Sequence, residues 1–262
     1  MSLYIFLLSY FYPLSVIIIN SFDFLFPFFL IFNSLLLINY AGAAARLLTL
    51  QNRCNNTIWP GIQATNGQPQ LMTGGIELEP LQSKNVTAPK GWSGRIWGRS
   101  GCTFNYYGEG SCNTGDCGAG FYCNGASAEP PASIAEFTLD SPLDFYDVSL
   151  LEGFNMPISI FANDESGTCP SVRCETDLNP HCPTNLLVRG DRGEIIGCKS
   201  ACTAFQTPEH CCTGQFQNPN ICKPTKFSRY FKQGCPASYT YTYDNSSLSF
   251  TCQDSNYVIV FC

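Results

Sequence analysis

Short segments in which hydrophobic and polar residues alternate recur along the chain from residue 46 onward. The clearest are residues 239–243 and 248–252, and residues 46–51 and 257–261 are expected to form strands at the two ends of the domain. In each of them, neighbouring side chains would point to opposite faces of an extended strand. Glycine, proline, asparagine, serine and threonine interrupt the chain at intervals of roughly eight to twelve residues. Many short strands at this spacing predict a mainly β fold, as a sandwich or a barrel.

Two stretches break the strand pattern. Residues 100–130 are rich in glycine and contain four cysteines, and residues 177–235 contain seven cysteines with helix-like segments at 199–211 and 226–233. We therefore predict a single domain, residues 46–262, that consists of a core and two inserted lobes. The core is assigned to three segments of chain: 46–99, 131–176 and 236–262.

The first 45 residues differ in composition from the rest of the chain. They contain one acidic residue, Asp23, and neither lysine nor arginine, and they end in the small-residue stretch 41–45. This boundary is typical of a signal-peptidase site, so we predict a signal peptide, residues 1–45, that is removed. The alternative is a retained membrane anchor, because the apolar stretch is long and no basic segment precedes it. Polar residues and a proline within residues 20–27 interrupt the stretch, which favours cleavage.

The cysteine content and the charge exclude several classes of function. The chain has 16 cysteines, no Cys-x-x-Cys pair and two histidines, His181 and His210. Zinc sites need closely spaced Cys or His ligands, so we predict neither a metal site nor another cofactor. An even number of cysteines instead indicates disulfides formed in an oxidising compartment. The formal net charge of −6 argues against nucleic acid as a partner, because binding to phosphates depends on a basic surface.

The pairing of the cysteines cannot be chosen from physical constraints alone, because 16 cysteines allow roughly two million pairings. Adjacent Cys211 and Cys212 would form a strained ring if they paired with each other, so each is expected to take another partner. A bond between Cys54 and Cys262 would close a loop of about 209 residues. By lowering the conformational entropy of the unfolded chain, it would stabilise the folded protein by roughly 5 kcal/mol.

Several motifs run in a fixed order along residues 46–262. They are Trp59-Pro60-Gly61, Gly94-Arg95-Ile96-Trp97-Gly98-Arg99, Gly108-Glu-Gly-Ser-Cys112-Asn-Thr-Gly-Asp-Cys117, Ile134-Ala135-Glu136-Phe137, Asp144-Phe145-Tyr146-Asp147, Gly153-Phe154-Asn155-Met156-Pro157 and Cys235-Pro236. In these motifs and in all 16 cysteines the chain resembles the thaumatin-like family of pathogenesis-related plant defence proteins. The resemblance implies a flattened β-sandwich core, a disulfide-rich lobe of loops and helices (residues 177–235) and a small hairpin lobe (residues 100–130).

The resemblance also implies a disulfide connectivity, taken by cysteine order. The implied pairs are Cys54–Cys262, Cys102–Cys112, Cys117–Cys123, Cys169–Cys252, Cys174–Cys235, Cys182–Cys198, Cys202–Cys211 and Cys212–Cys222. This connectivity satisfies the constraint on Cys211 and Cys212 and joins the two ends of the domain.

The family has a cleft between its sandwich and its disulfide-rich lobe, lined by one arginine and four carboxylates. By local motif, the resemblance places these charges at Arg95, Glu136, Asp147, Glu152 and Asp244. Glu152 stands where the family has an aspartate. Clustered acids repel one another, which raises the pKa of some of them, whereas Arg95 would hold one neighbour ionised.

The resemblance implies a secreted defence protein of the antifungal type, which we expect to act as a monomer in the apoplast without a permanent membrane anchor. Its partner would be β-1,3-glucan or a related polysaccharide of fungal or plant cell walls, bound in the acidic cleft.

One alternative is a weak endo-β-1,3-glucanase, with Glu136 as the general acid and Asp147 as the base. We expect their carboxyl groups to lie roughly 6.5–9.5 Å apart, as in inverting hydrolysis. No residue stands out as a proton donor in an apolar pocket, so the activity is expected to be weak. A second alternative is an inhibitor of microbial hydrolases that acts through another surface, since a fold does not determine a function.

Aromatic residues and sequons complete the set of candidates. Four aromatic residues lie in or near the cleft motifs: Phe145, Tyr146, Phe154 and Tyr241. Each could stack on a sugar, but packing in the sandwich core is the favoured assignment. Three Asn-x-Ser/Thr sequons, at Asn55, Asn85 and Asn245, are candidate glycosylation sites, and a glycan on Asn245 would stand beside Asp244.

Overall fold

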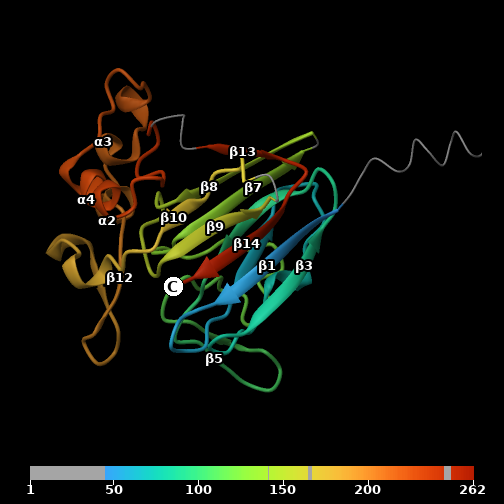
Figure 1. Cartoon of the computed structure of the whole chain (residues 1–262). Coiled ribbons are helices and arrows are strands. Elements are labelled where there is room, and N and C mark those ends of the chain that lie inside the picture. The colour runs from blue at the N-terminus through green and yellow to red at the C-terminus, as the bar shows by residue number, and fades with distance from the viewer. Residues whose placement is uncertain (1–44, 141, 165–166, 245–248) are drawn as a thin grey trace, which may run out of the picture. The chain divides into compact units, whose positions relative to one another are not determined.

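The computed structural model describes residues 45–140, 142–164, 167–244 and 249–262 (Figure 1). They form one compact unit that begins at Ala45. Residues 1–44 of the predicted signal peptide and the sequon at Asn245 lie outside the described residues. Within the described part of the chain, no helix is long and apolar enough to cross a membrane.

Two five-stranded sheets form the core, as the mainly β prediction required (Figure 1). The first sheet has the order β10-β9-β14-β1-β3 and the second the order β13-β8-β7-β4-β2. The strands of the first sheet are β1 (Arg46–Asn52), β3 (Ser83–Ala88), β9 (Ile158–Asn163), β10 (Val172–Cys174) and β14 (Asn256–Phe261). The strands of the second sheet are β2 (Gly61–Ala64), β4 (Ser93–Trp97), β7 (Ile134–Asp140), β8 (Leu143–Ser149) and β13 (Phe250–Gln253). Neighbouring strands are antiparallel except β1 and β14, which are parallel.

Alternation of side chains along the strands builds the core between the two sheets. On β7, Phe137 is buried, whereas its neighbours Glu136 and Thr138 point to the other face. Phe137 packs against Tyr257 of β14 with ring centroids 5.4 Å apart, and Tyr257 packs against Tyr146 at 5.1 Å. The apolar side chains buried in this way contribute about 25 cal/mol for each Å² removed from water.

The small lobe contains the hairpin β5 (Thr103–Phe104) and β6 (Gly110–Ser111) and projects below the sheets in Figure 1. It covers one end of the outer face of the second sheet. Trp97 and Ile134 of that face are buried in a cluster with the Cys117–Cys123 disulfide. The indole N–H of Trp97 donates to the carbonyl of Gly115 at 2.7 Å, which ties the lobe to β4.

The disulfide-rich lobe contains a two-stranded sheet and short helices, drawn in orange in Figure 1. Its strands and helices are β11 (Leu187–Arg189), β12 (Ile195–Cys198), α2 (Ala201–Phe205), α3 (Pro208–Cys211) and α4 (Lys226–Gly234). It also contains the 3₁₀ turns η2 (Asn179–His181), η3 (Thr184–Leu186) and η4 (Gly214–Phe216). One further 3₁₀ turn, η1 (Met72–Gly74), lies in the core segment 46–99. The helical stretch predicted at 199–211 is two helices, because Gln206 adopts a left-handed conformation (φ 53°) and Pro208 starts α3. The stretch predicted at 226–233 is α4, which Thr225 caps.

The prediction of a strand at 239–243 is wrong. Only Tyr239 pairs, in an isolated bridge to Ser149, and the chain then turns. The Asp244 carboxylate accepts hydrogen bonds from the Thr240 amide at 2.9 Å and the Thr240 hydroxyl at 2.8 Å. The Asp244 amide donates to the carbonyl of Tyr241 at 3.1 Å. These local bonds compete with a sheet ladder, so the alternation of Thr and Tyr does not form a strand.

The eight disulfides of the structure are the eight pairs that the resemblance implies, and no described cysteine is free. Cys54–Cys262 joins the ends of the parallel pair β1 and β14. Four pairs lie in the disulfide-rich lobe or attach it to the sandwich: Cys174–Cys235, Cys182–Cys198, Cys202–Cys211 and Cys212–Cys222.

Candidate functional site

The outer face of the second sheet carries a row of polar and charged residues in register. Gln63 of β2 lies opposite Arg95 of β4. Arg95 lies opposite Glu136 of β7, which in turn lies opposite Asp147 of β8. Directly opposed residues on adjacent strands have Cβ atoms about 4.5–5.5 Å apart. Three charged side chains that are far apart in the sequence therefore form one continuous row.

The hairpin lobe leaves this part of the face open. Trp97, two residues beyond Arg95, is buried under the lobe, whereas Thr138 and Phe145 on the other side of the row line an open hollow of about 400 Å³. Arg95, Glu136 and Asp147 line the same hollow. Gln63 donates through Nε2 to the carbonyl of Gly125 at 3.1 Å, so the lobe borders the row.

The two carboxyl groups of the row have different environments. Arg95 Nε and Glu136 Oε1 are 2.6 Å apart in a partly exposed ion pair. Asp147 lies deeper, and its buried Oδ1 atom has no hydrogen-bond partner among the residues that the structure describes. Burial, and next the charge of Glu136, raise the pKa of Asp147 to about 7, against the lowering effect of Arg95. Below that pH, the hollow holds the neutral carboxylic acid of Asp147 beside the Arg95–Glu136 ion pair.

The acid and base roles of the hydrolase hypothesis stay a prediction. The raised pKa of Asp147, next to the Arg95–Glu136 ion pair, favours Asp147 rather than Glu136 as the acid. The main cause of the raised pKa is burial, for which the sequence holds no direct signal. The expectation that no proton donor lies in an apolar pocket stays a prediction, because the hollow around Asp147 is lined largely by polar and charged residues. The wide carboxyl separation expected for Glu136 and Asp147 stays a prediction.

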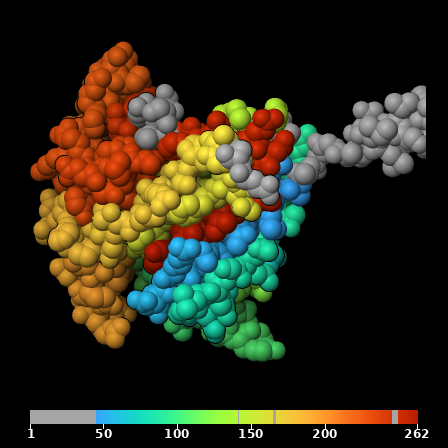
Figure 2. Space-filling model, in the orientation of Figure 1, coloured from blue at the N-terminus to red at the C-terminus, as the bar shows by residue number. Residues whose placement is uncertain are grey.

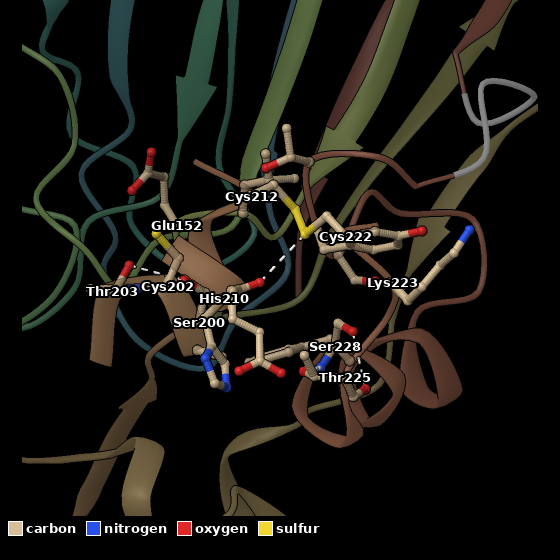
Figure 3. A pocket seen from close by; sticks show the side chains of 17 residues that line it. Glu152, Ser200, Cys202, Thr203, His210, Cys212, Cys222, Lys223, Thr225 and Ser228 are labelled. Carbon is tan, nitrogen blue, oxygen red and sulfur yellow. Dashed lines mark hydrogen bonds between the residues drawn. A yellow bond between two sulfur atoms is a disulfide. The ribbon is translucent and has the colours of Figure 1, made fainter. Parts of the chain in front are cut away.

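Glu152 and Asp244 do not line the hollow of Arg95, Glu136 and Asp147. Glu152 lines a second hollow of about 160 Å³, together with residues of the disulfide-rich lobe that include Ser200, His210 and Lys223 (Figure 3). Asp244 accepts from Lys232 Nζ, 2.7 Å from its Oδ2 atom, and from Thr240. Glu152 and Asp244 therefore belong to the junction with the disulfide-rich lobe.

One tyrosine connects the row to this junction. Burial raises the pKa of Tyr239, and the charges of Asp147, Asp244 and Glu136 raise it further, so its phenol lies in the field of three of the four candidate acids. Sequence reasoning missed Tyr239 as a site residue, because the alternating segment around it was assigned to a strand. Its bridge to Ser149, two residues after Asp147, is what brings it there.

The four aromatic candidates divide between core and surface. Tyr146 and Phe154 are wholly buried in the sandwich, as favoured for each. Phe145 is 43 % exposed and lines the hollow beside Asp147, so its assignment to the core is wrong. Tyr241 lines the second hollow. The odd positions of β8 face outward, which places Phe145 on the same face as Asp147.

Two of the three sequons lie on the surface of the described structure. Asn55 follows Cys54 and is exposed, and Asn85 is exposed on β3, where its Oδ1 atom accepts from the Thr49 hydroxyl at 2.9 Å. Glycosylation of these sites stays a prediction.

The two sheets, the two lobes and the eight disulfides define a disulfide-stapled β-sandwich protein with a charged row on one sheet face. The sequence model of the Thaumatin family matches residues 52–262. "Thaumatin-like protein" of Arabidopsis thaliana is 47 % identical over 233 residues, covering 88 % of this chain and 95 % of the relative. "Pathogenesis-related thaumatin-like protein 3.5" of Cryptomeria japonica is 48 % identical over 220 residues, covering 84 % and 91 %. The chain belongs to the thaumatin family.

Within that family it is similar to the pathogenesis-related, defence-type members. Its disulfide content is consistent with secretion. Among solved structures, the GH family 64 laminaripentaose-producing β-1,3-glucanase from Paenibacillus barengoltzii matches with a TM-score of 0.54 at 14 % identity, over 83 % of this chain and 74 % of the glucanase chain. At this identity, the match concerns the fold alone.

Proposed function

We propose that this protein is a plant defence protein of the apoplast that binds β-1,3-glucan, or a related wall polysaccharide, in the hollow of Arg95, Glu136 and Asp147. The observation that carries the proposal is the cross-strand row, which holds a guanidinium, a carboxylate and a neutral carboxylic acid side by side on an open sheet face. Sugar hydroxyls both donate and accept hydrogen bonds, so such a mixed row suits them. The exposed ring of Phe145 offers a stacking surface at the same hollow.

The rigidity of the row supports binding. Its residues lie within strands that are paired on both sides, β4 between β2 and β7, and β7 between β4 and β8. Arg95 and Glu136 are held by each other in an ion pair. Little side-chain freedom is therefore left to lose when a ligand binds.

Retention on insoluble β-1,3-glucan tests the proposal. Glu136→Gln keeps the shape of the side chain but loses its charge, and we expect binding to weaken by roughly tenfold or more, since hydrogen bonds to charged groups are the stronger ones. Glu175→Gln is the matched control, because Glu175 is an exposed, ion-paired glutamate on another part of the surface. Unchanged retention of Glu136→Gln would show that the glucan binds at another surface, whereas a wild-type protein that is not retained would favour the inhibitor of microbial hydrolases.

The second candidate function is weak endo-β-1,3-glucanase activity. It is favoured by the raised pKa of Asp147 beside the carboxylate of Glu136, since hydrolysis needs one protonated and one ionised carboxyl group. Release of reducing sugar from β-1,3-glucan distinguishes the two. Asp147→Asn would abolish release while keeping retention, because an amide donates a hydrogen bond but transfers no proton. A wild-type protein that is retained without releasing sugar is a binding protein only.

A further inference from the structure

The hairpin lobe presents an aromatic surface that neither the sandwich core nor the acidic hollow uses. Tyr106 and Tyr107 are 96 % and 83 % exposed, and Tyr122 is 49 % exposed. The lobe, drawn in green, protrudes at the lower edge of the molecule in Figure 2. Exposed apolar side chains are ordinary when scattered singly, but a cluster of them marks a binding surface.

These rings surround an open hollow of about 570 Å³. Its walls are mainly aromatic: Trp59, Phe104, Tyr106, Tyr107, Phe121 and Tyr122. Tyr106 and Tyr107 meet edge to face, with an interplanar angle of 81°, as do Phe121 and Tyr122 at 82°. In each pair the edge of one ring contacts one face of the other, and the high exposure of Tyr106 and Tyr107 leaves ring surface available to stack on a ligand.

A buried arginine holds the hollow in shape. Arg99 is wholly buried and donates to the carbonyls of Trp59 at 2.8 Å, Gly120 at 2.9 Å and Phe121 at 2.8 Å. Burial lowers the pKa of Arg99 to about 10, so the guanidinium stays charged at neutral pH. Disulfides Cys102–Cys112 and Cys117–Cys123 close the loops around it. A surface fixed in this way loses little conformational entropy on binding.

The charge at the hollow selects the kind of ligand. Glu77 is the charged side chain of its lining, it is exposed, and among the described residues it makes no hydrogen bond or ion pair. A carboxylate repels nucleic acid, acidic polysaccharides and anionic lipid surfaces, but it accepts hydrogen bonds from hydroxyl groups. Aromatic faces carry a partial negative charge, which attracts the C–H groups on the face of a sugar ring.

We propose that this hollow is a second binding site, for a neutral polysaccharide whose sugar rings stack on Tyr106 and Tyr107 and whose hydroxyls donate to Glu77. The hollow shares no lining residue with the hollow of Arg95, Glu136 and Asp147. The site therefore goes beyond the proposed function, and each of the two can fail without the other.

Tryptophan fluorescence gives a readout that is specific to this hollow. The chain has three tryptophans. Trp92 and Trp97 are wholly buried, whereas Trp59 is partly exposed and lines the hollow. Laminarihexaose, a neutral β-1,3-linked hexasaccharide, should change the fluorescence of the wild-type protein saturably. Trp59→Phe should remove that change, which verifies the reporter.

Paired variants separate stacking from other effects. We expect the double variant Tyr106→Ala, Tyr107→Ala to lose roughly tenfold or more in affinity, and the ring-preserving variant Tyr106→Phe, Tyr107→Phe to stay within about threefold. Both tyrosines are exposed, so thermal melting should show that all variants fold alike. Asp147→Asn should leave the Trp59 response unchanged.

Three results would overturn the proposal. One is a wild-type protein whose Trp59 fluorescence does not respond to the hexasaccharide, which would point to a protein partner for the aromatic surface. Another is an alanine variant that binds as the wild type does. The third is loss of the Trp59 response in Asp147→Asn, because the reporter would then follow the acidic hollow. A failure of the proposed function looks different: with Tyr106 and Tyr107 already replaced by alanine, Glu136→Gln leaves retention on insoluble glucan unchanged, while Trp59 of the wild-type protein still responds to the hexasaccharide.

Discussion

The sandwich and the disulfide-rich lobe are stabilised in different ways. In the sandwich, buried leucine, isoleucine, valine and aromatic side chains from two sheets form one continuous core. Of the nine buried hydrophobic residues in the described lobe segment 177–235, five are cysteines. They are Cys182, Cys198, Cys212, Cys222 and Cys235, beside Leu178, Leu186, Ala201 and Phe231. The lobe thus depends more on covalent bonds than the sandwich does, although Leu178, Leu186 and Phe231 join the apolar core of the sandwich.

Because of this difference, the charged residues on the sandwich and those beside the lobe should respond differently when the lobe is loosened. Arg95, Glu136 and Asp147 lie on strands of the sandwich, so their positions follow from strand register. Glu152 lines a hollow shared with the lobe, and Asp244 is paired with Lys232 of α4. Loosening the lobe should therefore disturb Glu152 and Asp244 and leave the row intact.

Reduction of the disulfides should have the largest effect. Loss of a native disulfide lowers the free energy of unfolding by about 2–5 kcal/mol. Four disulfides lie within the lobe or attach it to the sandwich. Under mild reduction, we expect amide protons of α2, α3 and α4 to lose their protection from hydrogen exchange before those of β1 and β14. Simultaneous loss of protection in both regions would show that the lobe and the sandwich are one cooperative unit.

Truncation of an apolar side chain should destabilise the protein more when the side chain lies in the sandwich than when it lies in the lobe. Leu50 on β1 is wholly buried, so Leu50→Ala should lower the free energy of unfolding by about 3 kcal/mol. Ile221 in the lobe is 53 % exposed, and Ile221→Ala should change it by less than about 0.5 kcal/mol. Urea unfolding monitored by circular dichroism measures both. Similar losses in the two variants would contradict the contrast between packing and covalent bonds.

Sequence reasoning succeeded at the two ends of the domain, where short segments rich in apolar residues form strands. Residues 46–51 and 257–261 are such segments, and they pair with each other in the first sheet. The same reasoning failed at 239–243, because Thr240 donates two hydrogen bonds to the nearby Asp244 carboxylate instead of pairing with a strand. The alternation of Thr and Tyr in the sequence does not reveal these bonds. The connectivity and the charged candidates came from the resemblance. The proton on Asp147 could not be predicted, because it depends on the burial of one carboxyl oxygen.

The pH dependence of stability should show a smaller effect, confined to the row. A carboxyl whose pKa is raised from 3.8 to about 7 by folding binds its proton more tightly in the folded than in the unfolded protein. Its stabilising contribution is present below about pH 4 and is lost as the pH rises to about 7. At pH 8, Asp147→Asn should therefore be more stable than the wild type, by roughly 2 kcal/mol after allowance for partial solvation. A constant difference between the two proteins from pH 4 to pH 8 would contradict the raised pKa.

The most direct test of glucan binding in the charged row is the pH profile of retention on insoluble β-1,3-glucan. It is best measured with Tyr106 and Tyr107 replaced by alanine, so that the hairpin lobe does not contribute. With Asp147 intact, retention should be strong at pH 5 and weaken by roughly tenfold as the pH passes about 7, because the carboxyl loses the proton that it donates to the sugar. With the further change Asp147→Asn, the profile should be flat, since the amide donates at every pH. Parallel profiles for the two proteins, whether both flat or both falling, would show that Asp147 does not contact the glucan.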